Sequence, residues 1–160
     1  MSPKQEEMNE RRRIGVEITC SWQDSDVLEI RVSATNGVFA GLAYPYVSHL
    51  DLQSAAAILK GFPEDFQDSR EVVLGDRRER FAGGFLSFLF TARDSAGHCA
   101  VEVQITSKND SRAEPRWNRV PQSVTLIAGV DAAAIANFAV DLVRLGETKA
   151  GTAWLQFSKV

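Results

Sequence analysis

The sequence predicts an α+β fold, with a mainly antiparallel twisted sheet of about six or seven strands and two helices, the C-terminal helix packed on the sheet. Apolar and polar residues alternate with a period of two in several segments, and turn residues separate these segments. Two other segments repeat apolar residues with the helical period. A chain of 160 residues, 44% apolar and 24% charged, suits one domain, which we place at residues 14–160 after a flexible tail at 1–13.

The first predicted elements are a hairpin and a returning strand. The first strand carries apolar side chains at every second position: Ile14, Val16, Ile18 and Cys20. A polar turn connects it to a second alternating strand at 28–34. Asn36 and Gly37 form a turn pair that accepts positive φ, so residues 38–44 are expected to return as a third strand. Pro45 ends the pairing because proline has no N–H.

A short helix and an edge strand follow. Ser48 and Asp51 resemble a capping box with a shorter acid, so a helix is expected to begin there. Its apolar stripe has helical spacing: Leu52, Ala55, Ala56 and Leu59. Gly61 followed by Pro63 ends the helix. Residues 70–74 then predict a brief edge strand.

The strongest local pattern predicts a long central hairpin. Residues 85–93 are rich in aromatic and aliphatic side chains, residues 94–97 have turn chemistry, and residues 99–106 alternate between apolar and polar. Apolar side chains occupy both faces of the first arm. We therefore expect this strand to be covered on both sides, with a helix supplying the cover.

The C-terminal part contains a loop, a strand, a helix and a tail. Residues 107–121 are polar and form a long loop, and residues 124–128 form a last strand. Asp131 caps a helix of period 3.6 that ends at Gly146. The tail around Trp154 carries enough apolar surface to dock on the rest of the domain.

Composition excludes several classes of protein. The net charge of −3 disfavours nucleic-acid binding, since the overall field repels a phosphate backbone. We find no secretory signal and no apolar stretch long enough to span a bilayer, and we expect a cytoplasmic location without membrane association. Cys20 and Cys99 lack metal-site spacing, so no disulfide framework or metal site is expected. No phosphate loop or dinucleotide fingerprint is present, so no cofactor is expected.

Few features of the sequence indicate a catalytic function. One hypothesis is a Cys–His nucleophile pair, with His49 or His98 brought near Cys20 or Cys99 by folding. We favour the alternative that both thiols lie on core faces of strands and both histidines are solvated, since free cysteine is among the most buried residue types. The carboxylate pairs lie in loops or in the tail. We assign no catalytic residue and favour a non-enzymatic function.

Two arginine-rich segments form the candidate binding site. Arg and Trp are over-represented among interface hot spots, and an exposed Trp in a long loop is uncommon. The alternative is that both segments are solvated loops, with the Trp folded back on the core. The candidates are Arg77, Arg78 and Arg80 in the first segment, and Arg112, Arg116, Trp117 and Arg119 in the second.

The hairpin turn at 91–98, the alternating residues 99–103 and the Ala-rich final helix resemble a group of small bacterial domains of unknown function. Some members of this group resemble immunity proteins for contact-delivered toxins. The resemblance covers residues 14–145 and carries no catalytic residue across. The arginine-rich insertion at 108–119 and the Trp154 tail depart from that group.

These observations support two hypotheses of function. The leading hypothesis is a protein-binding module, in the form of a toxin-neutralising, immunity-like protein, that presents a sheet face or its long loop to another protein. The alternative is a small-molecule-binding or hydrolytic domain whose pocket lies between the sheet and the C-terminal helix and uses His98 or Cys99. A homo-oligomer that pairs exposed strand edges is compatible with either hypothesis.

Overall fold

Two antiparallel sheets form the framework of the protein, in a computed structural model that describes residues 2–5, 13–77, 83–108 and 121–158. Within these ranges the chain forms nine strands, and the predicted α+β class is confirmed. The strands are divided between two sheets, whereas the sequence predicted one sheet of about six or seven strands. Alternation identifies a half-buried strand but does not say which sheet the strand joins, because both sheets show the same pattern.

The first sheet, called sheet A, has the strand order β3-β2-β1-β9, and β4 pairs with the start of β2. Its strands are β1 (Gly15–Gln23), β2 (Leu28–Thr35), β3 (Ala40–Ala43), β4 (Tyr46–Val47) and β9 (Thr152–Gln156). The predicted first hairpin is confirmed as β1 and β2, and the predicted third strand as β3. The C-terminal tail docks as predicted, as an edge strand antiparallel to β1.

The second sheet, called sheet B, has the strand order β5-β6-β7-β8, each strand antiparallel to the next. Its strands are β5 (Ser69–Gly75), β6 (Phe85–Ala92), β7 (His98–Ser107) and β8 (Gln122–Asp131). The predicted central hairpin is β6 and β7, and β5 lies at an edge as expected.

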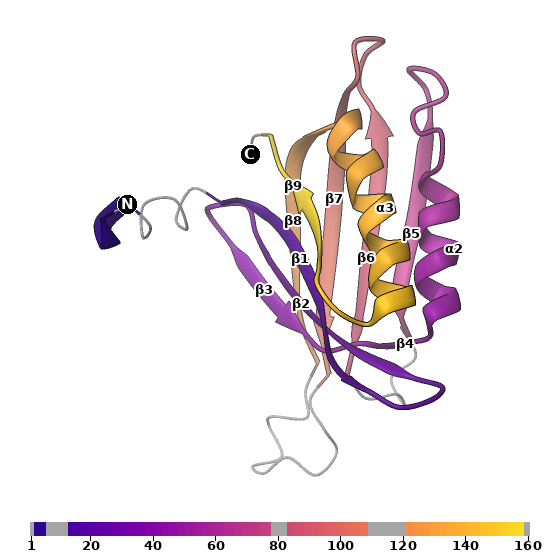
Figure 1. Ribbon diagram of the computed structural model, residues 1–160. Helices are drawn as coiled ribbons and strands as arrows, with labels where there is room; N and C mark the ends of the chain where they lie inside the picture. The colour runs from indigo at the N-terminus through magenta and orange to yellow at the C-terminus, as the bar shows by residue number, and fades with distance from the viewer. Residues whose placement is uncertain (1, 6–12, 78–82, 109–120, 159–160) are drawn as a thin grey trace.

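Two helices and sheet A together cover one face of sheet B. In Figure 1, α2 (His49–Leu59) and α3 (Ala132–Thr148) lie side by side in front of sheet B, and sheet A crosses in front of β7 and β8. Gly41 of β3 approaches Ile105 and Val124 so closely that a Cβ would lie 2.6 Å from the Val124 side chain. A residue without a side chain is therefore needed where the sheets meet.

Aromatic rings fill the centre between the two layers. Phe88 of β6 stacks on Phe90 with 5.5 Å between ring centroids and meets Phe138 of α3 edge-on at 5.4 Å. All three rings are completely buried. Such offset and edge-to-face pairs add stabilisation beyond that of burial alone. The core therefore joins the central hairpin to the C-terminal helix.

Local sequence signals begin and end the helices. The Ser48 hydroxyl accepts a hydrogen bond from the Asp51 N–H, and the Asp51 carboxylate accepts one from the Ser48 N–H, which confirms the capping box. Helix α3 follows β8 without a loop, since Asp131 both ends the strand and serves as the N-cap. None of the helices in the described ranges combines the length and apolarity needed to cross a bilayer.

The outer face of sheet B, turned away from the helices, differs from the prediction. Phe85 and Ser87 are buried on this face, but Leu89 is 38% exposed. No helix or second sheet of the described chain lies over it, because α2, α3 and sheet A all pack against the inner face. The prediction that the first arm of the hairpin is covered on both sides is therefore wrong at Leu89.

Candidate functional site

Only Arg77 of the predicted binding residues lies in the described part of the chain. Arg78, Arg80, Arg112, Arg116, Trp117 and Arg119 lie outside the described residues. The Arg77 guanidinium donates to the Glu71 carboxylate at 2.6 Å and lies 5.5 Å from the centroid of the Phe85 ring. Both partners of the ion pair are half exposed, so the pair adds little stability. Arg77 remains a candidate for contact with a partner.

The described residues that flank the two arginine-rich segments meet at one end of sheet B. The Gly83 N–H donates to the Lys108 carbonyl at 3.3 Å. The Lys108 ammonium donates to the Asp76 carbonyl at 3.1 Å. The chain therefore enters and leaves both segments at the same end of this sheet, although about thirty residues separate the segments in the sequence.

The geometry does not support a nucleophile built from Cys99 and His98. Successive residues of a strand point to opposite faces, and Cys99 is buried in the core while His98 is exposed. Burial raises the pKa of the Cys99 thiol, and the charges of Asp94 and Asp131 raise it further. A raised pKa lowers the fraction of reactive thiolate. Cys20 is half-buried and donates to the Trp22 carbonyl at 3.4 Å.

His98 forms an ion pair in the turn between β6 and β7. Its Nδ1 lies 2.7 Å from the Asp94 Oδ2, and this hydrogen bond, together with the charge of Asp94, raises the pKa of His98 above its ordinary value. The stabilisation is fully present below the unfolded pKa of about 6.5 and is lost as the pH rises through the folded pKa. We expect an NMR titration of His98 to give a raised pKa that returns towards the ordinary value in Asp94→Asn. An unchanged pKa in that variant would contradict the assignment.

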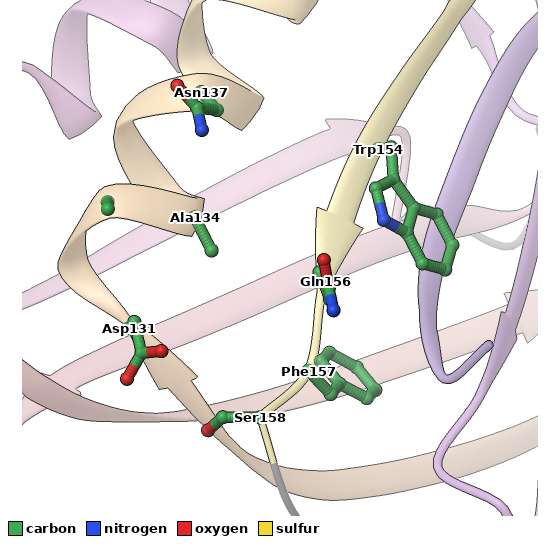
Figure 2. A pocket seen from close by; sticks show the side chains of 8 residues that line it. Asp131, Ala134, Asn137, Trp154, Gln156, Phe157 and Ser158 are labelled. Carbon is green, nitrogen blue, oxygen red and sulfur yellow. The ribbon is translucent and has the colours of Figure 1, made fainter. Parts of the chain in front are cut away.

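A pocket of 280 Å³ opens between the first turns of α3 and strand β9. Figure 2 shows Asn137 on the helix wall, Gln156 on the strand wall, and Asp131 and Ser158 at one end. Its lining residues are Asp131, Ala133, Ala134, Asn137, Trp154, Gln156, Phe157 and Ser158. It lies between a sheet and the C-terminal helix, where the alternative hypothesis placed a pocket, but neither His98 nor Cys99 lines it.

The polar side chains of this pocket are available to a ligand. Asp131 is the N-cap of α3, yet its carboxylate makes no capping hydrogen bond. Within the described chain, the side chains of Asp131, Asn137 and Gln156 have no hydrogen-bonding partner. Amides both donate and accept, so the pocket matches a ligand that also carries both kinds of group. Neither a His nor a Cys side chain is among its described lining residues.

The outer face of sheet A, turned away from sheet B, is aromatic. Register places Leu42, Tyr46 and Trp154 on this face, opposite Ser33, Glu29 and Glu17 respectively. Trp22 is 51% exposed and Tyr46 is 42% exposed. The Arg13 guanidinium lies 4.2 Å from the centroid of the Trp154 ring. We call Trp22, Leu42, Tyr46 and Trp154 the aromatic face.

A β-bulge brings Trp22 to the aromatic face. Cys20 pairs with the buried Ile30, whereas Trp22 pairs with the outward-facing Glu29, so one residue is inserted between them. Strict alternation would have placed Trp22 on the inner side with Cys20, because the period of a strand is two. Sequence reasoning missed the aromatic face for this reason. The alternation of the neighbouring residues Glu17 and Thr19 did indicate that this side of β1 is outward.

A second hollow lies between the helices. It has a volume of 490 Å³, and small apolar residues of α2 and α3 line most of it, including Ala56, Ala139 and Val143. Lys60 and Gln53 are the polar side chains at its border. No group of His, Cys, Asp or Glu side chains able to hold a metal ion occurs among the residues that the structure describes.

Comparison of the chain with models of known protein families, with curated proteins and with solved structures found no match.

Proposed function

We propose that this protein is a non-enzymatic binding module that docks another protein on the aromatic face of sheet A. One observation carries the proposal: Trp22, Tyr46, Trp154 and Leu42 share one outward sheet face. Trp and Tyr are enriched in protein interfaces and dominate binding energy where they become desolvated. Exposed aromatic side chains gathered on one face indicate an interaction site.

The charges around the aromatic face favour a reversible interface. Glu17, Glu29 and Arg31 lie on the same face, so it carries both signs of charge. A partner with complementary charges would gain specificity and association rate from these residues. The face is polar enough to be stable in water without the partner, as is typical of a non-obligate complex.

Toxin neutralisation is the specific form of this activity that we propose. It rests on the resemblance of the hairpin and final helix to a group of small bacterial domains, some members of which resemble immunity proteins. The partner would then be a toxin delivered into the cytoplasm, where this protein would meet it. The arginine-rich segments would extend the contact, since their flanking residues are held by a folded sheet. Arg is favoured in such contacts because its guanidinium forms bidentate hydrogen bonds with carboxylates.

Affinity capture with matched baits tests the binding proposal. We expect the wild-type chain to retain one near-stoichiometric protein from source-cell lysate or culture fluid, and a Trp22→Ala/Tyr46→Ala double variant to bind it at least about thirtyfold more weakly. The matched control is Leu89→Ala/Ile127→Ala, which removes exposed apolar groups from the outer face of sheet B. Thermal unfolding should remain nearly unchanged in both variants.

Three outcomes of this experiment count against the proposal. Retention of the partner by the aromatic-face variant would move the interface elsewhere. Loss of the partner in the control variant would assign binding to sheet B. If the wild-type chain retains no protein from either lysate or culture fluid, the proposed protein-binding function is wrong.

A further inference from the structure

Strand β9 has a free edge that faces the pocket beside α3. The Trp154 N–H donates to the Asp141 carboxylate of α3 at 3.2 Å, so it points away from β1. The Phe157 N–H donates to the Ile14 carbonyl at 3.1 Å, so it points towards β1. Backbone groups alternate in direction along a strand. The N–H and C=O of Gln156 therefore lie on the same free edge as the N–H of Trp154.

The protein itself closes two positions of this edge. Asp141 occupies the Trp154 N–H, and the Ser158 N–H donates to the Gly129 carbonyl of β8 at 2.8 Å. Gln156 lies between these two closed positions. Its backbone N–H and C=O have no partner within the described chain. Thr152 also presents its backbone to this edge but does not line the pocket, so Gln156 is the open position of the described strand that the pocket reaches.

We infer that the pocket between α3 and β9 binds a short extended peptide segment of the partner, which pairs with Gln156. In antiparallel pairing, one residue of the segment exchanges two hydrogen bonds with Gln156, one with its N–H and one with its C=O. The amide side chains of Asn137 and Gln156 can bond to the next peptide groups, and Trp154 can contact an apolar side chain. This inference rests on the proposed function and specifies which part of the partner enters the pocket.

Size and position agree with a peptide of a few residues. The volume of 280 Å³ lies just below the range of about 300–1,000 Å³ that is typical of sites for drug-sized molecules, so the pocket has room for a segment of a few residues. Trp154 belongs both to this pocket and to the aromatic face, and its neighbour along the free edge is Gln156. A partner seated on that face can therefore extend a strand end into the pocket without a second interface.

A titration with short peptides tests the inference without the natural partner. The probe is acetyl-Val-Ala-Val-amide, whose β-branched residues favour an extended chain. We expect saturable NMR shifts of the wild-type chain at Gln156 and Ser158 and at the Asn137 side-chain amide. The matched probe carries an N-methyl group on the central alanine, which removes the N–H that the Gln156 carbonyl accepts. It should bind at least tenfold more weakly.

Two variants at one position separate backbone from side chain. Gln156→Pro removes the edge N–H but leaves the hydrogen bonds to β1, because proline is tolerated where the N–H points away from the sheet. Gln156→Ala keeps the N–H and removes the side-chain amide. We expect at least a tenfold loss in peptide affinity for the proline variant and a smaller loss for the alanine variant. Asn137→Ala, on the opposite wall, should weaken binding as well and does not depend on the proline variant folding.

Several results would overturn the inference. These are shifts away from the pocket, no shifts at all, equal affinity for the N-methylated probe, or unchanged affinity in a folded Gln156→Pro variant. A dimer in sedimentation that is lost in Gln156→Pro would assign the edge to a second copy of the chain. Each of these results leaves the aromatic face untouched, whereas retention of the partner by the Trp22→Ala/Tyr46→Ala variant would overturn the proposed function itself.

Discussion

Replacing Phe88 with alanine is expected to lower the free energy of unfolding by about 3–5 kcal/mol. Phe88 is completely buried and contacts the rings of Phe90 and Phe138. The substitution removes a large apolar group and leaves a cavity where β6 meets α3. The cavity cannot collapse easily, because both neighbours of β6 hold it in register. Urea denaturation monitored by circular dichroism measures the loss as a lower midpoint.

The matched control for Phe88 is the next residue of the same strand. Leu89→Ala should cost at most about 1 kcal/mol, because the Leu89 side chain lies on the open face of sheet B and is partly exposed. Equal losses in the two variants would mean that both faces of β6 are covered, in conflict with the structure.

The second large effect is expected for Gly84→Ala, which should lower the free energy of unfolding by more than about 3 kcal/mol. Gly84 has a φ of +92°, and an added Cβ would collide with the carbonyl oxygen of Thr106. Thr106 is fixed in β7 opposite Phe85, so its carbonyl cannot move without breaking the ladder. Left-handed strain and the collision therefore add together. The measurement is again the midpoint of urea denaturation.

Gly61 provides the control that isolates backbone strain from collision. Its φ is +74°, but no atom lies within 4 Å of an added Cβ. Gly61→Ala should therefore cost only about 1–2 kcal/mol, the penalty for placing a side chain in the left-handed region. A loss in Gly84→Ala no larger than that in Gly61→Ala would show that the chain relaxes around the new Cβ.

Local patterns in the sequence predicted the strands and helices well where one segment's own residues decide its structure. Ser48 and Asp51 form the predicted cap, and the strong alternation around Val101 and Val103 lies in the predicted central hairpin. These signals act over a few residues, because capping and side-chain alternation depend on neighbouring positions along one chain segment. The docking of the tail as β9 followed from its apolar residues.

The candidate site could not be predicted in the same way. Trp22 faces outward only because of a bulge, and a bulge depends on how β1 pairs with β2. The pocket joins Asn137 of α3 to Gln156 of β9, and the free backbone of Gln156 exists because β9 lies at the edge of its sheet. Strand order and edge position are not encoded in the alternation of a single strand.

The sequence by itself determined the fold class, the capped first helix, the central hairpin and the placement of Cys99 in the core. Only the tertiary structure decided the division into two sheets, the open outer face of sheet B, the aromatic face and the pocket. The physical reason is the distance along the chain over which each kind of signal acts. Propensity, capping and alternation act between neighbours in the sequence, whereas a surface or a pocket is formed by side chains that distant segments bring together when they bury their apolar faces.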